Sequence, residues 1–394
     1  KITDMLYRCH ECVEKGADVT EPFEIVGERF RAIVEELGVA LDIDRELDSI
    51  RKRMLECKTA DFIASRGEYL NARIAAAMLG WEFVDAADVI RFGANGRLLT
   101  KETDSAVAER LGSGKPTVVP GFYGSMPDGS IKTFSRGGSD ITGALLARGA
   151  RANIYENWTD VSGVLMADPR IVSNAKSIPT LTYRELRELS YMGANVLHEE
   201  AVFPVVDIDI PVNVRNTNSP NDLGTMIVKN VAGSTSTVTG IAGRKGYTVI
   251  TLEKNLLNTE VGFGRRLLSA LENWQVSFEH MPTGIDTVSL VIESANLKGK
   301  LESVLANIRK ECQPDVLDVT QNMALIATVG RGMRETPGVA GKLFSALSEA
   351  KVNVMMIDQG SSQGSGGINI IIGVEEADFE PAIRAIYEIG RAHV

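Results

Sequence analysis

The sequence predicts an α/β protein: a doubly wound, mostly parallel sheet followed by two small α+β modules. Three observations support this fold class. Apolar strand-like runs alternate with amphipathic helical stretches through the first half of the chain. Residues 231–237 are small and polar, which is typical of a domain boundary. Beyond them, the order strand, helix, strand, strand, helix occurs twice, with a repeat of about 75 residues.

The composition is that of a globular chain with two or three domains. Of the 394 residues, 44% are hydrophobic and 24% are charged. The chain has 42 basic and 52 acidic residues, a net charge of −10, and no long basic run. This balance argues against nucleic acid or an anionic membrane as the main partner. No window approaches the ~20 apolar residues of a membrane span and no signal peptide is visible, so we expect a cytoplasmic protein.

The four cysteines do not form a disulfide scaffold in a chain of this length. Cys9 and Cys12 make a C-x-x-C pair, but a zinc site needs a second pair, and Cys57 and Cys312 stand alone. We therefore expect no metal site from cysteine, only two thiols one helical turn apart.

Residues 1–60 are expected to be mainly helical, because apolar residues recur there at helical spacing. Thr3 could cap the first helix. A helix rich in Ala and Leu follows at 69–79. Ser65 could be its N-cap, with Glu68 completing a capping box. Alternatively, the Glu68 carboxylate could pair with a cationic ligand group.

Strands with turn residues at their ends follow along the chain. Asp128-Gly129 indicates a hairpin turn. An amphipathic helix is predicted at 181–189, capped by Thr180 or Thr182. The predicted strands are residues 81–84, 89–92, 115–122, 152–158 and 210–215.

The stretch 133–147 is the one around which the chain is organised. Arg136-Gly-Gly-Ser-Asp140 directly precedes residues 141–148, whose apolar positions form one helical face. A helix start offers unpaired N–H groups and partial positive charge, and glycines let the backbone approach a ligand, so this turn suits an anion. Arg136 adds a forked donor for carboxylate or phosphate. The alternative is a capped helix after a tight turn, with Ser139 or Asp140 as N-cap and Arg136 exposed.

The two modules after the boundary have the same predicted order of elements. The first contains strand 247–253, helix 263–272, strands 275–279 and 287–292, and helix 301–310. The second contains strand 323–329, helix 339–349, strands 352–357 and 367–373, and helix 379–387.

Several motifs at this spacing resemble one family. They are Arg136-Gly-Gly-Ser-Asp140, Trp158-Thr-Asp-Val-Ser-Gly-Val-Leu-Met-Ala-Asp-Pro-Arg170 and Gly193-Ala-Asn-Val-Leu-His198. Together they resemble the aspartate kinases (aspartokinases) of the amino-acid kinase family. The residues Pro337-Gly-Val-Ala340 and Val352-Asn-Val354 resemble the ACT domain, a small ferredoxin-like module that senses amino acids.

This resemblance implies a domain plan and an incomplete chain. The plan has a catalytic domain at 1–230, a linker and first ACT module at 231–320, a second ACT module at 321–388, and a non-native tail at 389–394. The chain lacks the strand and glycine-rich Lys-Phe-Gly-Gly segment with which aspartate kinases begin. Its last residues back-translate to the start of a common sequencing adapter. We therefore expect a fragment of a longer reading frame.

The implied activity is ATP-dependent phosphorylation of the L-aspartate side-chain carboxylate to 4-phospho-L-aspartate, with ATP and Mg²⁺. This reaction is the first step of lysine, threonine and methionine biosynthesis. A carboxylate is ionised at neutral pH and needs no general base, so catalysis is positioning and charge neutralisation. By resemblance, Arg136 grips the α-carboxylate, Glu68 pairs with the ammonium, and Asp140 and Arg136 are catalytic, with Asp140 holding the catalytic cations. The implied substrate residues are Thr3, Glu68, Arg136, Gly137, Gly138 and Ser139.

The implied nucleotide site departs from the family at two positions. Leu165 stands where many members have an aromatic residue, and Asn195 stands where a lysine commonly reaches the phosphates. Losing that cation should weaken transition-state stabilisation. The implied nucleotide residues are Thr159, Asp160, Leu165, Arg170, Asn195 and Val196.

Paired ACT modules imply feedback by an aspartate-derived amino acid, with lysine as the expected effector, acting on a homodimer or higher homo-oligomer. On the residues alone, Glu279 could equally be a surface carboxylate. The implied effector residues are Asn258, Gly262, Ser277, Glu279, Gly338 and Asn353.

Two other functions remain open: a catalytically impaired amino-acid sensor, suggested by Asn195, and an amino-acid kinase with another acidic substrate. The effector, the oligomer size and a fusion to homoserine dehydrogenase remain undecided.

Overall fold

The computed structural model describes residues 2–112, 114–135, 137–194, 197, 199–231, 237–333, 336–359 and 368–391. The chain forms two compact units. The first comprises Lys1–Ser162 and Leu197–Lys229, and the second comprises Gly163–Val196 and Asn230–Val394. The stretch 163–196, which the sequence analysis assigned to the catalytic domain, is therefore part of the second unit.

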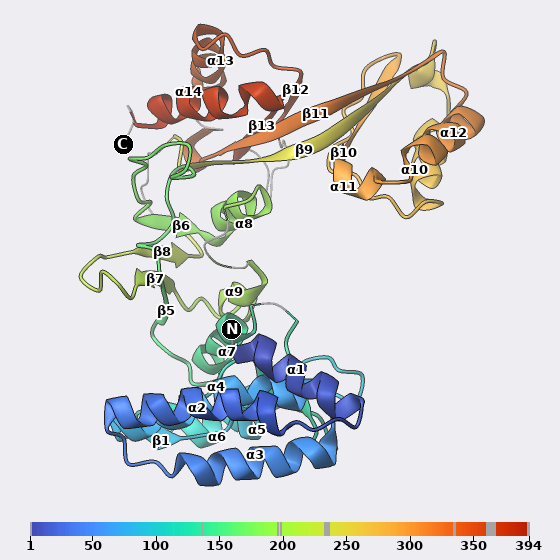
Figure 1. The fold of residues 1–394 in the computed structure, drawn as a ribbon. Helices are drawn as coiled ribbons and strands as arrows, with labels where there is room; N and C mark the ends of the chain where they lie inside the picture. Colours follow the sequence, from blue (N-terminus) through green and yellow to red (C-terminus); the bar gives the residue numbers. More distant parts are fainter. Residues whose placement is uncertain are drawn as a thin grey trace. The chain divides into compact units, whose positions relative to one another are not determined.

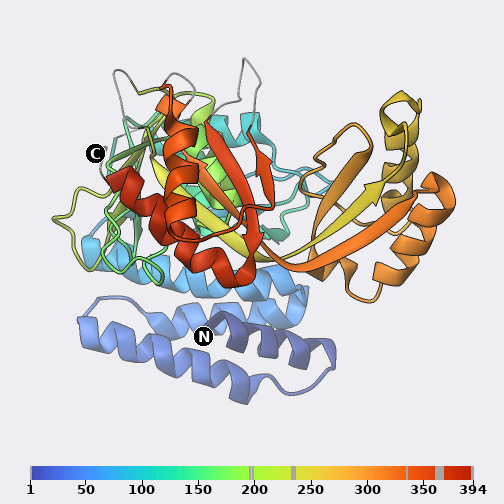
Figure 2. The ribbon, with the colours of Figure 1, turned by 90° about the horizontal axis from the view of Figure 1, so that it is seen from above.

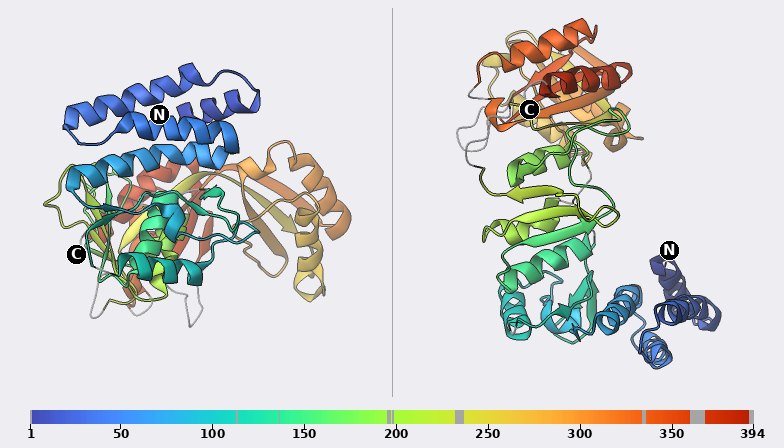
Figure 3. Two further views of the ribbon diagram at one scale, coloured as in Figure 1. Left: turned by 90° about the horizontal axis from the view of Figure 1, so that it is seen from below. Right: turned by 90° about the vertical axis from the view of Figure 1, so that its left-hand side faces the viewer.

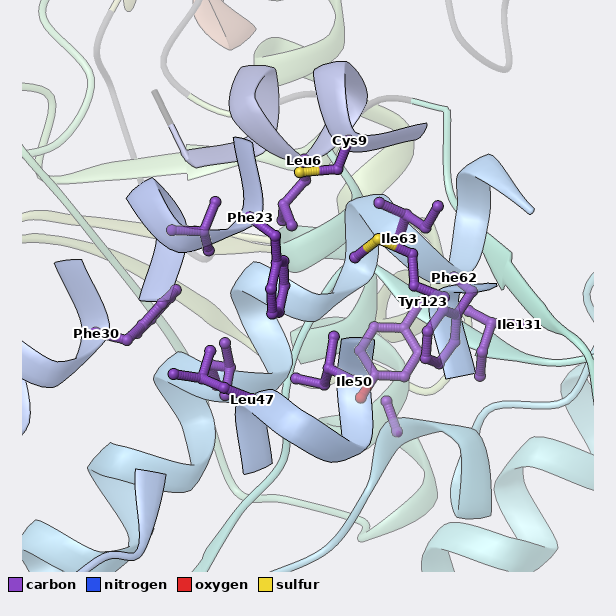
Figure 4. Close-up of a cluster of buried hydrophobic side chains, with 14 of the residues drawn as sticks. Leu6, Cys9, Phe23, Phe30, Leu47, Ile50, Phe62, Ile63, Tyr123 and Ile131 are labelled. Atoms are coloured by element: carbon purple, nitrogen blue, oxygen red, sulfur yellow. The ribbon is translucent and has the colours of Figure 1, made fainter. Parts of the chain in front are cut away.

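Four helices open the first unit: α1 (Ile2–Glu14), α2 (Thr20–Leu37), α3 (Ile43–Cys57) and α4 (Ala60–Leu79) (Figures 1 and 2). The first three lie together on one side of α4 (Figure 3). Each presents one apolar stripe, because its apolar residues recur every three or four positions. These stripes meet in a core where Leu6, Phe23, Leu47 and Ile63 are almost fully buried (Figure 4). The predicted helical start of the chain is confirmed.

Two predicted helix caps in this region are wrong. Helix α4 begins at Ala60, so Ser65 lies inside it, where its Oγ donates a 2.7 Å hydrogen bond to the main-chain oxygen of Phe62. Phe62 and Ile63 extend the buried face of the same helix, and packing of that face overrides the cap signal. Thr3 is likewise the second residue of α1 and does not cap it.

Short parallel strands form the sheet part of the first unit. β1 (Glu82–Phe83) pairs with β2 (Thr117–Val118), and β5 (Tyr155–Thr159) pairs with β7 (Val212–Asn216). β8 (Thr225–Val228) joins β7 in antiparallel register. Helix α7 (Gly138–Gly149) packs against α6 (Thr100–Leu111), α9 (Glu199–Val206) and β5.

The predicted hairpin is confirmed, whereas one predicted strand is only partly right. β3 (Tyr123–Ser125) and β4 (Ile131–Thr133) are antiparallel around Asp128 and Gly129, and Asp128 Oδ1 accepts a 2.9 Å hydrogen bond from the Ser130 N–H. In place of a strand at 89–92, the short helix α5 (Ala86–Val89) precedes two isolated bridges, a parallel one between Arg91 and Ser125 and an antiparallel one between Phe92 and Leu98.

The second unit begins with β6 (Thr180–Thr182) and α8 (Tyr183–Tyr191). Of the two caps considered, Thr182 is the observed one: it forms a capping box with Glu185. The helix follows the predicted amphipathic pattern, with Leu186 and Leu189 buried.

One antiparallel sheet carries both modules (Figure 1). Its strands lie in the order β10 (Thr287–Glu293), β9 (Gly240–Glu253), β11 (Val316–Val329), β13 (Asn369–Glu375) and β12 (Met356–Asp358). Helices α10 (Phe263–Glu272), α11 (Ser294–Leu297) and α12 (Leu301–Cys312) belong to the first module; α13 (Val339–Glu349) and α14 (Phe379–Arg391) belong to the second. Three short 3₁₀ turns lie at Leu257–Thr259, Arg331–Met333 and Glu376–Asp378.

Strands β9 and β11 are longer than predicted and run through both modules. Residues 247–253 of β9 pair with β10, and residues 249–253 pair with the first half of β11. Residues 240–247 of β9 pair with 323–329 of β11, which also pair with β13. The second module therefore uses a strand that precedes the first module in sequence, and a single boundary near residue 320 does not separate them.

The predicted strand at 275–279 is wrong. Gln275 has a positive φ of 51°, and among residues 276–283 only His280 and Thr283 form isolated bridges, to Val291 and Val288 of β10. The alternation of polar and apolar residues suggested a strand, but the tight end of α10 leaves this segment irregular.

Candidate active site

Five of the predicted substrate residues line one pocket of about 490 Å³ in the first unit. Thr3 comes from α1, Glu68 from α4, and Gly137, Gly138 and Ser139 from the start of α7. This volume lies within the usual range for small-molecule sites. The remaining lining residues are Ile2, Arg29, Phe30, Ile33, Ala64, Gly67, Asn71, Phe122 and Ser135.

The paired glycines form the N-terminus of α7 by backbone geometry alone. Gly137 is the N-cap, in the left-handed region at φ 56°, and no side chain caps the helix. The alternative with Ser139 or Asp140 as N-cap is therefore wrong, because the helix already begins at Gly138. A Cβ on Gly138 would lie 2.8 Å from the ring of Phe122, so only glycine allows this close approach. The first-turn N–H groups have no acceptor within the helix and face an anion favourably.

Arg136 lies outside the described residues. Its predicted role in binding the α-carboxylate of the substrate stays a prediction.

Glu68 is a half-buried carboxylate in the pocket wall. Burial raises the pKa of Glu68 above its usual value. Among the described residues none forms a hydrogen bond or an ion pair with it. A desolvated carboxylate of this kind is stabilised by a cation that enters the pocket, such as an ammonium group.

Asp140 is held from two sides by strand β5. Its Oδ1 accepts a 2.9 Å hydrogen bond from Nδ2 of Asn157, and its main-chain oxygen accepts a 3.1 Å hydrogen bond from the hydroxyl of Tyr155. Sequence reasoning missed both residues. Their spacing of two along a strand, which places them on one face, was the available signal.

Two further pocket residues were also missed. Arg29 of α2 brings an exposed guanidinium to the pocket, and Phe122 has an unusual φ of 81°. The Phe122 N–H donates to Oγ1 of Thr142 at 3.1 Å, and its carbonyl accepts from the Phe134 N–H at 2.9 Å. These two bonds hold Phe122 in a conformation that a non-glycine residue rarely adopts. No sequence pattern predicts such a φ value at a phenylalanine.

The predicted nucleotide residues are divided between the two units. Thr159 is the last residue of β5 in the first unit and Asp160 follows it; Asp160 Oδ1 accepts a 3.3 Å hydrogen bond from Thr159 Oγ1. Leu165 and Arg170 belong to the second unit. Arg170 is exposed and pairs with Asp168 at 2.6 Å, and this guanidinium holds the pKa of Asp168 below its usual value. Asn195 and Val196 lie outside the described residues.

The predicted effector residues all belong to the second unit. Gly262 and Gly338 are N-caps of α10 and α13 with φ values of 84° and 87°, so they occupy equivalent places in the two modules. Ser277 Oγ accepts a 3.1 Å hydrogen bond from Nδ2 of Asn296. Glu279 accepts a hydrogen bond from the Tyr191 hydroxyl at the end of α8.

The other two predicted effector residues are Asn258 and Asn353. Asn258 lies in the turn before Gly262, and its N–H donates to the main-chain oxygen of Ile285 at 3.1 Å. Asn353 is exposed beyond α13.

The described part of the chain contains no cluster of three or more His, Cys, Asp or Glu side chains placed to hold a metal ion. Within the same residues, no helix is long and apolar enough to cross a membrane.

Comparisons with known proteins agree along nearly the whole chain. The model of the amino acid kinase family matches residues 24–216, and an ACT domain model matches residues 326–389. The chain is 37% identical to aspartokinase 3 of Bacillus subtilis, over 98% of this chain and 88% of that protein. The crystal structure of Clostridium acetobutylicum aspartate kinase is 52% identical with a TM-score of 0.93, covering 98% of this chain and 89% of that one. E. coli aspartokinase III, solved with aspartate and ADP, is 26% identical with a TM-score of 0.70, covering 98% and 90%.

Proposed function

The chain belongs to the amino acid kinase family, in its aspartokinase branch, and from this premise we propose that it transfers the γ-phosphoryl group of ATP to the side-chain carboxylate of L-aspartate. The family and the fold class predicted from the sequence are confirmed. The observation that carries the proposal is the pocket in which Glu68, Thr3 and the first turn of α7 meet. The complex of E. coli aspartokinase III with aspartate and ADP supports the choice of substrates.

The chain's contribution to the reaction is to hold two anions together. One oxygen of the aspartate side-chain carboxylate forms the new P–O bond, while the bond between the γ-phosphorus and the oxygen of ADP breaks. The attacking carboxylate is already ionised, so no residue has to remove a proton. Glu68 pairs with the substrate ammonium, and the N–H groups of Gly138 and Ser139 face its carboxylate charge.

Asp140 fits a role in holding Mg²⁺ with the nucleotide. Its Oδ1 is occupied by Asn157, and no described residue donates a hydrogen bond to its Oδ2. Carboxylate oxygens are preferred ligands of Mg²⁺, which takes its other ligands from water and substrate phosphates. When bound, Mg²⁺ neutralises charge on the transferring phosphoryl group.

Release of ADP from ATP, Mg²⁺ and L-aspartate tests the function directly. We expect turnover that saturates with aspartate and is absent without it. Glutamate and N-acetylglutamate serve as matched acceptors, and turnover with either of them in place of aspartate would assign the site to another acidic substrate. Binding of amino acids without ADP release would instead identify a sensor, the alternative suggested by Asn195.

Arg136→Ala tests the predicted carboxylate grip in the complete enzyme. We expect the KM for aspartate to rise by about tenfold or more, since a charge-assisted bidentate contact contributes roughly 1.5–3 kcal/mol. The KM for ATP should change little. Equal effects on both substrates, or no effect on either, would remove Arg136 from the substrate site.

We place feedback regulation in the second unit, with an aspartate-derived amino acid, lysine first, bound near Gly262 and Glu279 of a homodimer or higher homo-oligomer. The repeated glycine N-caps of α10 and α13 support a pair of equivalent modules. Inhibition assays with lysine, threonine and methionine, singly and together, test the effector. Insensitivity to all of them would contradict this assignment.

A further inference from the structure

Asn157 is a buried polar residue whose side chain is committed to Asp140. Its side chain is on β5, and only 8% of the residue is exposed. Its Nδ2 donates to Oδ1 of Asp140 at 2.9 Å and to the hydroxyl oxygen of Tyr155 at 3.0 Å. Tyr155 in turn donates to the main-chain oxygen of Asp140 at 3.1 Å. The three residues form a closed set of hydrogen bonds that fixes both the side chain and the backbone of Asp140.

The surrounding fold places the side chains of Tyr155 and Asn157 beside the first turn of α7. Tyr155 and Asn157 are two residues apart on one strand and so point to the same face of the sheet. Parallel pairing with β7 fixes their height along the strand. Gly143, one turn after Asp140, leaves room for the Tyr155 ring, because a Cβ there would lie 2.7 Å from the tyrosine oxygen.

A neutral amide is the suitable donor for this position. A buried polar side chain is stable where its hydrogen bonds are satisfied, as those of Asn157 Nδ2 are. An apolar side chain could fill the same position, but it could not donate a hydrogen bond to Asp140. An amide orients the carboxylate while leaving its negative charge intact. A lysine would neutralise that charge, and an aspartate would compete with it for a proton. Asn157 therefore fixes Oδ1 of Asp140 through a neutral hydrogen bond.

We propose that Asn157, assisted by Tyr155, is a positioning residue that fixes Asp140 for phosphoryl transfer. This inference rests on the proposed function, which gives Asp140 its role beside the transferring group. Neither residue needs to touch a substrate, so their effect falls on kcat rather than on aspartate binding. The aspartate pocket does not include either of them.

Asn157→Leu is the decisive variant, measured in the complete enzyme as kcat and both KM values. Leucine keeps the size and suits the buried face, so the variant should fold, but it removes the donor to Asp140. We expect kcat to fall roughly tenfold or more, with the KM for aspartate unchanged.

A second variant and a control separate positioning from stability. Tyr155→Phe removes only the hydroxyl that donates to the main-chain oxygen of Asp140, and it should also lower kcat. Asn153→Leu, at an exposed asparagine before the same strand, is the matched control and should behave as wild type. Wild-type kcat in Asn157→Leu, or a rise in the KM for aspartate with kcat unchanged, would overturn the inference. Absence of aspartate-dependent ADP release in the wild type would instead overturn the proposed function.

Discussion

The pKa values of individual carboxyl groups in this molecule are shifted in opposite directions, and the direction distinguishes carboxylates held in ion pairs from the candidate ligand-binding carboxylate. Asp168 is paired with Arg170, which lowers its pKa, and Glu260 is held in the same way by Lys254. Glu68 is half-buried and has no such partner among the described residues, so desolvation raises its pKa. A group kept in an unfavourable state by the free protein is a candidate for ligand binding.

Glu68→Gln should therefore stabilise the ligand-free protein. Because the pKa of Glu68 is raised on folding, the native state binds this proton more tightly than the unfolded state, and stability falls as pH rises through the raised pKa. Glutamine removes this loss, so the variant should have the higher Tm near neutral pH, with the difference vanishing in acid. Thermal unfolding across pH measures this. A lower Tm for Glu68→Gln at neutral pH would show that the carboxylate is paired in the free protein.

At the scale of elements, two helices bring the site together, and each is fixed by a different contact. In α4, the guanidinium of Arg66 is buried and lies 4.5 Å from the Phe62 ring and 4.9 Å from the Tyr123 ring of β3. This stacking ties α4, and with it Glu68, to the hairpin. In α7, Gly143 permits contact with Tyr155.

Gly143→Ala should disturb α7 although alanine favours helices. The added methyl would overlap the Tyr155 ring, and overpacking costs about 1–3 kcal/mol, more than the ~1 kcal/mol of helix propensity gained. We expect lower stability and lower kcat, because the displaced Tyr155 no longer holds Asp140. Gly341→Ala in α13 is the control: its Cβ would meet nothing within 4 Å, and it should gain roughly 0.5–1 kcal/mol. Urea unfolding compares the two, and equal gains would show that the ring moves aside freely.

Helix α8 is fixed by one buried acid. Glu185 is fully buried, accepts hydrogen bonds from Thr182 at 2.7 Å and from Thr239 at 2.6 Å, and pairs with Arg331 at 3.2 Å. These contacts join the stretch 180–191 to the ACT sheet within the second unit.

Glu185→Ala should loosen this helix strongly. Removing one partner of a buried ion pair costs about 3–5 kcal/mol, so amide hydrogen exchange across α8 should accelerate by roughly a hundredfold or more. Glu349→Ala, an exposed acid at the end of α13, is the control and should leave exchange unchanged. Unchanged exchange in Glu185→Ala would mean that apolar packing alone holds the helix.

At the scale of the whole molecule, the candidate substrate pocket lies in the first unit, and the ACT sheet lies in the second. The glycine-rich turn and the repeated modules could be identified from the sequence because both are local patterns. The sequence did not predict that 163–196 belongs with the second unit or that β9 and β11 run through both modules. The length of β9 and β11 depends on pairing between residues 63 (Glu253 with Val316) to 89 (Gly240 with Val329) positions apart, and local periodicity gives no information about such distant pairs.

The candidate site was predictable to a similar degree. Thr3, Glu68 and the Gly137–Ser139 turn could be named from motifs, and they share a pocket. The cap at Ser65 was misjudged because packing of Phe62 and Ile63 outweighs a local hydrogen-bond signal. Asn157 and Tyr155 were missed because their role depends on which helix packs against β5. The positive φ of Phe122 was missed because no sequence pattern predicts it.

The central claim is that Glu68 receives the ammonium group of aspartate in this pocket. It is tested most directly by measuring the KM for aspartate and for ATP in Glu68→Gln, beside the exposed control Glu35→Gln. The account predicts that the KM for aspartate rises by about tenfold or more in Glu68→Gln alone, as expected for losing a charge-assisted contact, while the KM for ATP stays unchanged. A KM for aspartate equal to that of the wild type would contradict it.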